Sequence, residues 1–279
     1  ARCYEFRKQD SKELFAVKII QKCNLTKPRS KQKVRAPLMQ LISEIKIHES
    51  LRHPNIVEFK HTFEDNQNVY ILLELCTNHT LNDLLKRKKR LSEPEMQLYL
   101  LQLLDSLIYL HDAKIIHRDL KLGNLFLTEA MSLKLGDFGL ASRIEFPGDK
   151  RKTICGTPNY IAPEILESKG HSYEVDTWSF GIIMYTLTFG RPPFESKDVK
   201  ETYKKIKAIS YSFPEGNSAS PSLKNLITSI LQREPHKRPT LKDIKEHEFF
   251  RGSSLSRQTS ILLKVQASTS NLTKLPSYK

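Results

Sequence analysis

Three short strings decide how this chain folds: HRDLKLGN at residues 117–124, DFG at 137–139 and APE at 162–164. At about 5% usage per residue type, the five fixed letters of the first string would arise by chance in roughly one chain of this length in ten thousand. The other two strings follow it in order. The combination is therefore a specific signal for one kind of fold and site.

These strings resemble the catalytic loop, the metal-binding loop and the end of the activation segment of protein kinases. The resemblance implies that Asp119 accepts the proton of a substrate hydroxyl and that Lys121 stabilises charge on the phosphoryl group being transferred. It also implies ATP and Mg²⁺ as cofactors, with Asn124 and Asp137 as hard oxygen ligands of the metal. Taken singly, each residue has a structural alternative as a solvated side chain or a turn cap. Their joint spacing favours the functional interpretation.

Residues 1–75 are predicted to form a small antiparallel sheet with one helix. Four runs have the composition of strands: Arg2–Arg7, Leu14–Ile20, Ile56–Thr62 and Val69–Leu75. Leu41, Ile45 and His48 recur at helical spacing, and the pattern stops before Pro54. This region is the predicted small lobe.

Residues 76–250 are predicted to form a larger, mainly helical lobe. A capping box at Ser92–Glu95 opens a segment that is apolar nearly all round, and Glu174–Thr188 has the same character. Helices of this kind are buried. The expected fold is therefore α+β with two lobes, followed by a Ser/Thr-rich flexible tail over residues 251–279.

The nucleotide site is expected between the lobes. By the resemblance, Lys18 pairs with the ATP phosphates and with an acidic residue of the small-lobe helix; Glu44 is the preferred partner and Glu49 the second choice. A strand lysine can also be a simple edge charge. Residues 73–76 lie where the backbone would bind adenine, although they also fit the end of a buried strand. The residues expected around the base are Cys3, Ala16, Leu73, Glu74, Cys76 and Phe126.

Thr153 is a candidate regulatory site within the activation segment. It follows Lys150, Arg151 and Lys152, and a phosphate on its hydroxyl would gain charge-assisted hydrogen bonds from Arg118. An upstream kinase would then act on this protein. The alternative is an unmodified loop threonine.

Four further residues are assigned supporting roles by the resemblance. Thr157 would brace the catalytic Asp119, as in Ser/Thr-directed kinases. Glu164 would form a buried ion pair with Arg238. Asp176 would accept hydrogen bonds from the backbone of the catalytic loop.

Composition limits the partners. The net charge of +14 attracts anions, but there is no zinc-finger spacing or aromatic RNA-binding strand, so acidic protein substrates are favoured over nucleic acid. No apolar run approaches the ~20 residues of a membrane helix. Four scattered cysteines indicate a reducing compartment, and a cytoplasmic or nuclear monomer is expected. The basic run at 86–90 is either a nuclear-import signal or a solvated helix end.

Over about residues 1–250 the chain resembles the polo-like Ser/Thr kinases. The strings that carry this resemblance are LELC at 73–76, DLKLGNLF at 119–126, TICGTPNYIAPE at 153–164 and GHSYEVD at 170–176. The resemblance implies Ser/Thr substrates in acidic contexts on cell-division proteins, and a place at the centrosome or spindle.

Three departures from the family pattern leave alternatives open. The first strand with the glycine-rich loop and the polo boxes are expected to be missing, and residues 34–40 look like an insert that an unspliced short intron could encode. A catalytically impaired kinase-fold fragment or scaffold is therefore one alternative. An Aurora-like or calcium/calmodulin-dependent kinase is another.

Overall fold

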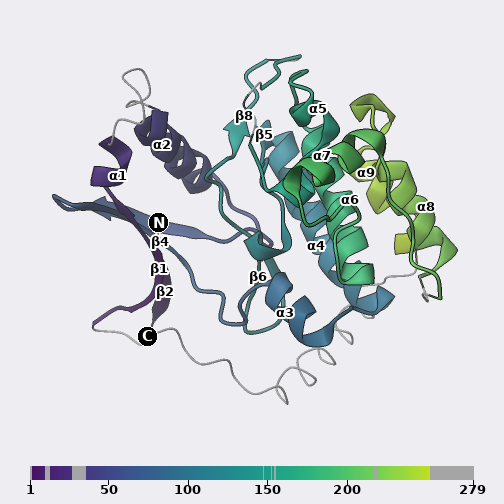
Figure 1. Cartoon of the computed structure of the whole chain (residues 1–279). Coiled ribbons are helices and arrows are strands. Elements are labelled where there is room, and N and C mark those ends of the chain that lie inside the picture. The colour runs from purple at the N-terminus through teal and green to yellow at the C-terminus, as the bar shows by residue number, and fades with distance from the viewer. Residues whose placement is uncertain are drawn as a thin grey trace.

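The computed structural model of the chain describes residues 2–9, 13–26, 36–146, 148–151, 153, 155–216 and 219–251. It has two lobes (Figure 1), the smaller one built on a four-stranded antiparallel sheet in the order β1-β2-β4-β3. The strands are β1 (Arg2–Arg7), β2 (Leu14–Gln21), β3 (Phe59–Glu64) and β4 (Asn68–Glu74). The predicted α+β architecture with two lobes is confirmed.

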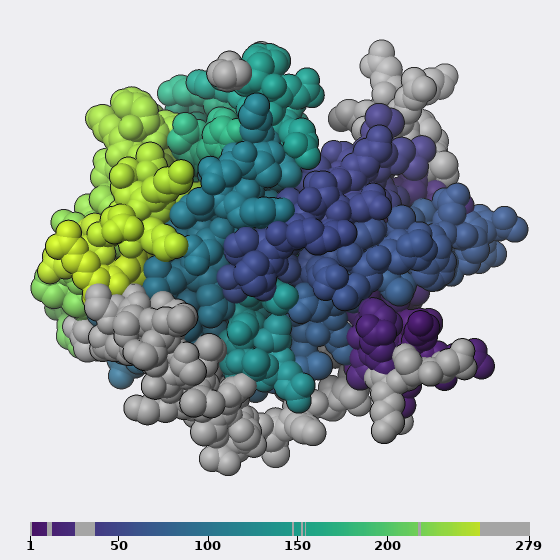
Figure 2. All heavy atoms as spheres, turned by 180° about the vertical axis from the view of Figure 1, so that it is seen from behind, coloured from purple at the N-terminus to yellow at the C-terminus, as the bar shows by residue number. Residues whose placement is uncertain are grey.

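Helix α2 (Ala36–Glu49) covers one face of this sheet. Leu41 of the helix packs with Phe59, Val69 and Ile71 in a small apolar core. Burial of these side chains fixes the helix against the sheet, because apolar area removed from water is the main favourable term in packing. Figure 2 shows α2 at the surface beside the helical lobe. A short helix, α1 (Cys23–Thr26), precedes it.

The structure corrects one expectation for this lobe and places part of another. The third strand was expected at Ile56–Thr62 but begins at Phe59, because Ile56 turns toward the other lobe and forms an isolated bridge with Leu135. Of the suspected insert, residues 36–40 extend helix α2 at its N-terminal end, whereas residues 34 and 35 lie outside the described residues.

The larger lobe is built around two buried helices, as expected. Helix α4 (Glu93–Asp112) is 20 residues long and begins with the predicted capping box between Ser92 and Glu95. In α6 (Glu174–Phe189) every residue from Val175 to Leu187 is buried. Gly181 allows α6 to lie against α8, since a Cβ there would come within 2.5 Å of Ile230.

The remaining elements surround these two helices. They are α3 (Leu81–Lys88), α5 (Pro163–Leu166), α7 (Val199–Ala208), α8 (Pro221–Ile230) and α9 (Leu241–Lys245), with four short 3₁₀ turns. Two small strand pairs, β5 (Ile115–Ile116) with β8 (Ser142–Arg143) and β6 (Leu125–Leu127) with β7 (Leu133–Leu135), face the small lobe. They position the strings at 117–124 and 137–139.

The structure bears on the basic run at 86–90, on the tail and on possible membrane helices. The basic run at 86–90 lies at the end of α3, where Lys88 pairs with Glu95 at 2.5 Å. The predicted tail beyond Arg251 lies outside the described residues. Among the described helices, none is both long and apolar enough to cross a membrane.

Candidate active site

Asp119 is held by three side chains of the larger lobe. Its Oδ1 accepts from the Thr157 hydroxyl at 2.8 Å and its Oδ2 from Lys121 Nζ at 2.7 Å. Asn124 Nδ2 donates to the Asp119 carbonyl at 2.8 Å. Lys121 also reaches the Thr157 hydroxyl at 3.2 Å. A carboxylate fixed in this way can accept a proton from a hydroxyl placed beside it.

A buried carboxylate of helix α6 fixes the catalytic loop. Asp176 is fully buried and accepts from the backbone N–H groups of His117 and Arg118, both at 2.9 Å, and from His111 Nε2 at 3.0 Å. Burial alone would raise the pKa of Asp176, but these donors outweigh it and the pKa is lowered. The expected contact between Asp176 and the loop backbone is confirmed.

The small lobe contributes an ion-pair network. Lys18 Nζ lies 2.5 Å from Glu44 Oε1 and 3.2 Å from Asp137 Oδ1. Burial disfavours the charged lysine, yet the two carboxylates outweigh it and raise the pKa of Lys18. The expected pairing of Lys18 with Glu44, rather than with Glu49, is confirmed.

The same network keeps Asp137 ionised. Burial would raise its pKa, but Lys18 outweighs this effect and the pKa of Asp137 is lowered. Its backbone is in the left-handed region, with φ of 59°. A non-glycine residue in this conformation has some strain, which is common where a side chain must be aimed at a ligand.

Asp137 and Asn124 fit a magnesium ion. The amide nitrogen of Asn124 donates to the Asp119 carbonyl, so its side-chain oxygen is the atom that could bind the metal. Within the described part of the chain, no three His, Cys, Asp or Glu side chains form a metal-binding group. Mg²⁺ needs no such cage, because it is usually held by one or two protein oxygens together with substrate phosphates.

The sheet register gathers the other expected nucleotide-binding residues. Cys3 lies opposite Lys18, and Ala16 lies opposite Leu73, so all four share one face. Burial raises the pKa of the Cys76 thiol to about 12, so the thiol is neutral near pH 7.

Glu74 and Phe126 frame the far side of this region. The Glu74 side chain pairs with Lys134 at 2.9 Å, and its backbone N–H donates to the Glu58 carbonyl at 2.9 Å. Phe126 on β6 covers Gly136, where a Cβ would come within 2.9 Å of the ring.

The activation segment lies beside Arg118. Thr153 is exposed, and Arg118 is anchored through Nε to the Leu140 carbonyl at 2.7 Å. Arg151 forms a backbone bridge with His171, and its side chain pairs with Asp149. The neighbouring Lys152 lies outside the described residues.

The predicted ion pair between Glu164 and Arg238 is confirmed and is bidentate. The two N–O distances are 2.7 and 2.8 Å, and both residues are buried. Arg238 also donates to the Glu174 carbonyl at 2.9 Å and lies 5.0 Å over the Trp178 ring. This pair ties the end of the activation segment to the helical core.

Two residues of helix α2 were missed by the sequence interpretation. The His48 ring packs at a tilt against Phe138, with a 4.6 Å centroid separation and an interplanar angle of 43°, and it contacts the Val57 carbonyl at 2.7 Å. Burial lowers its pKa to about 4, so the ring is neutral near pH 7. Gln40 donates to the Gly139 carbonyl at 2.7 Å. The spacing of four between these residues and Glu44 was the available signal.

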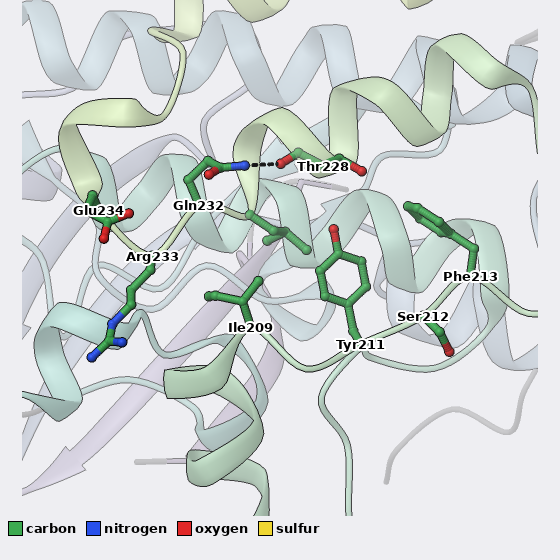
Figure 3. A pocket seen from close by; sticks show the side chains of 9 residues that line it. Ile209, Tyr211, Ser212, Phe213, Thr228, Gln232, Arg233 and Glu234 are labelled. Atoms are coloured by element: carbon green, nitrogen blue, oxygen red, sulfur yellow. Dashed lines mark hydrogen bonds between the residues drawn. The ribbon is translucent and has the colours of Figure 1, made fainter.

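A pocket of about 430 Å³ lies apart from this site, between α7 and α8 (Figure 3). Tyr211 and Phe213 form its wall, and Gln232 closes one side by a hydrogen bond to the Thr228 carbonyl at 2.8 Å. None of the candidate catalytic or nucleotide-binding residues lines it. This pocket is therefore separate from the candidate active site between the lobes.

Comparisons with known proteins agree with this geometry. Residues 1–250 match the family described as "Protein kinase domain". Over 255 residues the chain is 60% identical to the probable serine/threonine-protein kinase CCRP1 of Zea mays, covering 91% of this chain and 40% of that protein.

Two other relatives give the same picture. The chain is 50% identical over 278 residues to the probable serine/threonine-protein kinase PLK of Dictyostelium discoideum, covering 99% of this chain and 27% of that protein. It is 48% identical over 255 residues to the serine/threonine-protein kinase polo of Drosophila melanogaster, covering 91% and 43% respectively. The chain thus spans less than half of each relative.

Proposed function

Because this chain belongs to the protein kinase family and is similar to polo-like kinases, we propose that it transfers the γ-phosphate of ATP to Ser/Thr hydroxyls of proteins that control cell division. One observation carries the proposal. An ion-pair network joins the lobes through Lys18, Glu44 and Asp137. In the larger lobe, Asp119 is held by Lys121 and Thr157. These contacts support the proposed roles of Lys18 as the cation, Asp137 as a metal ligand and Asp119 as the base.

Each group has one task in the proposed reaction. Bound Mg²⁺ would neutralise charge on the ATP phosphates, held by Asp137 and Asn124. Lys18 would orient the α- and β-phosphates. Asp119 would accept the proton of the attacking hydroxyl, and Lys121 would stabilise charge on the transferred group. Catalysis of this kind rests on positioning and electrostatics rather than on covalent chemistry by the protein.

A basic pocket beside the catalytic loop supports acidic substrates. This cavity of about 450 Å³ is lined by Leu122 of the loop and by Lys86, Lys89 and Arg191. Glu195 is the one carboxylate among its lining residues. Excess positive charge favours a substrate with carboxylates near the phosphoacceptor and disfavours a basic one.

The decisive experiment is transfer of radiolabelled γ-phosphate to two serine peptides that differ only in acidic or basic flanking residues. We expect the acidic peptide to have a kcat/KM about tenfold higher, the effect of ~1.4 kcal/mol of attraction. Lys18→Met should lower the rate at least about a hundredfold, because a fixed electrostatic contact to the phosphates is lost.

The controls separate enzyme from scaffold. A Lys22→Met variant changes a lysine that pairs with Glu64 at the other end of the same sheet, and it should remain active. Equal rates for the parent chain and Lys18→Met would refute the assignment of Lys18. Absence of transfer by the parent chain would favour a scaffold.

We also propose that an upstream kinase switches the protein on at Thr153. Its phosphate would gain charge-assisted bonds from Arg118. Thr153→Asp should raise the unphosphorylated rate, and phosphorylation should raise it roughly tenfold, as one or two such bonds allow. Thr153→Val should abolish the response to phosphorylation. Rates measured with and without an activating kinase check this, and a full response in Thr153→Val would place the switch elsewhere.

The cellular setting is part of the same proposal. A cytoplasmic or nuclear monomer acting at the centrosome or spindle would suit substrates involved in cell division. Imaging of the tagged full-length protein through mitosis tests the location, and a uniform distribution throughout division would contradict it.

A further inference from the structure

Helix α2 contacts the metal-binding loop through three residues on one of its faces. Gln40, Glu44 and His48 are four residues apart and therefore lie one helical turn from each other. The His48 ring lies tilted against Phe138, with 4.6 Å between the ring centroids. Glu44 Oε2 lies 3.3 Å from where a Cβ of Gly139 would be. Gln40 Nε2 donates to the Gly139 carbonyl at 2.7 Å.

The Gln40 contact holds the main chain of the loop. Glycine has the widest backbone freedom of any residue, so a bond at its carbonyl removes freedom that no side chain there could restrict. The Asp137 carboxylate lies against the same glycine, because its Oδ1 is 3.3 Å from where a Cβ of Gly139 would be. Gln40 and the metal ligand are therefore connected through a single glycine.

We propose that Gln40 is a positioning residue that holds the Gly139 carbonyl against helix α2 and thereby keeps the Asp137 carboxylate in place for the metal. The identity of the metal rests on the proposed function, whereas the contact belongs to the chain alone. Helix α2 and the loop then move as one unit. A displacement of the helix would move Glu44 away from Lys18 and release Gly139 at the same time.

The position requires a hydrogen-bond donor rather than glutamine itself. A chain lacking residues 34–40 would place Lys33 four residues before Glu44, and a lysine ammonium is also a donor. Gln40→Lys should therefore preserve the contact. Gln40→Glu has nearly the same shape but presents an acceptor to a carbonyl and adds a third carboxylate beside Glu44 and Asp137, so it should break the contact.

Hydrogen exchange of the nucleotide-free protein tests the contact directly. The amides of residues 137–140 should exchange roughly two- to tenfold faster in Gln40→Ala and Gln40→Glu, the range for one partly solvated hydrogen bond. In Gln40→Lys the same amides should exchange at the parent rate. Met39→Ala is the matched control, because this neighbouring side chain is 57% exposed.

A second measurement tests the consequence for the metal. The Mg²⁺ concentration for half-maximal phosphotransfer should rise by a similar factor in Gln40→Ala, while KM for the peptide stays unchanged. Unchanged loop exchange in Gln40→Ala would overturn the proposal, as would equally faster exchange along all of α2, which would indicate fraying of the helix. Faster loop exchange with an unchanged Mg²⁺ requirement would refute the positioning role. If the parent chain transferred no phosphate, the proposed function would fail, and the exchange result would still decide the contact.

Discussion

Replacing Asp119 by asparagine should lower kcat for phosphotransfer by roughly a hundred- to ten-thousandfold, the range for loss of a positioned general base. Asparagine has the size of aspartate but cannot take the proton of the attacking hydroxyl. Its amide would also present N–H groups to Lys121 or Thr157, which now donate to the carboxylate. Steady-state rates at saturating ATP and peptide measure the effect.

ATP affinity separates a chemical effect from a folding effect. Asp119 contacts the catalytic loop and the activation segment, not Lys18, so the Kd for ATP should change by less than about threefold. Asp112→Asn, an exposed change at the end of α4, is the matched control and should keep the parent rate. An Asp119→Asn enzyme with more than a tenth of the parent kcat would show that another group accepts the proton.

The small lobe shows what the sequence alone could predict. The hairpin of β1 and β2 was predictable because alternation and a polar turn are local signals. The Lys18–Glu44 pair was expected from the resemblance to protein kinases, and Glu44 was preferred because it lies on the small-lobe helix and clear of its start. The contacts of Asp176 and Arg238 were assigned from the resemblance to protein kinases, because its motifs imply contacts between residues far apart in the sequence.

For other contacts, no signal in the sequence identified the partner residue. Ile56 reads as the start of a strand, but it is buried against Leu135 of the other lobe, a choice made by tertiary packing. Gln40 and Gly139 are 99 residues apart, and an exposed glutamine beside a suspected insert gives no sign of its partner. His48 fits an apolar stripe, and its ring contact with Phe138 joins residues 90 positions apart, which no local pattern indicates. Local sequence patterns show which side of a helix or strand is buried, whereas long-range packing determines which residues that side contacts.

Replacing Arg238 by alanine should destabilise the helical lobe by about 3–5 kcal/mol, the cost of leaving one member of a buried ion pair without its partner. Glu164 is only 4% exposed and would lose both of its bonds to the guanidinium. The Glu174 carbonyl would also lose a donor, and the Trp178 ring would lose the cation above it. In a chain of this size the melting temperature should fall by roughly 10 °C, as measured by circular dichroism.

A double variant distinguishes a lost charge pair from lost packing. In Glu164→Gln/Arg238→Met the buried charges are gone while most of the volume remains, so its destabilisation should be smaller than that of Arg238→Ala alone. The surface pair of Arg233 with Glu167 offers the contrast, because Arg233 is 53% exposed and its alanine variant should lose less than about 1 kcal/mol. If Arg238→Ala and Arg233→Ala melted at the same temperature, the buried pair would not be what anchors the activation segment to the core.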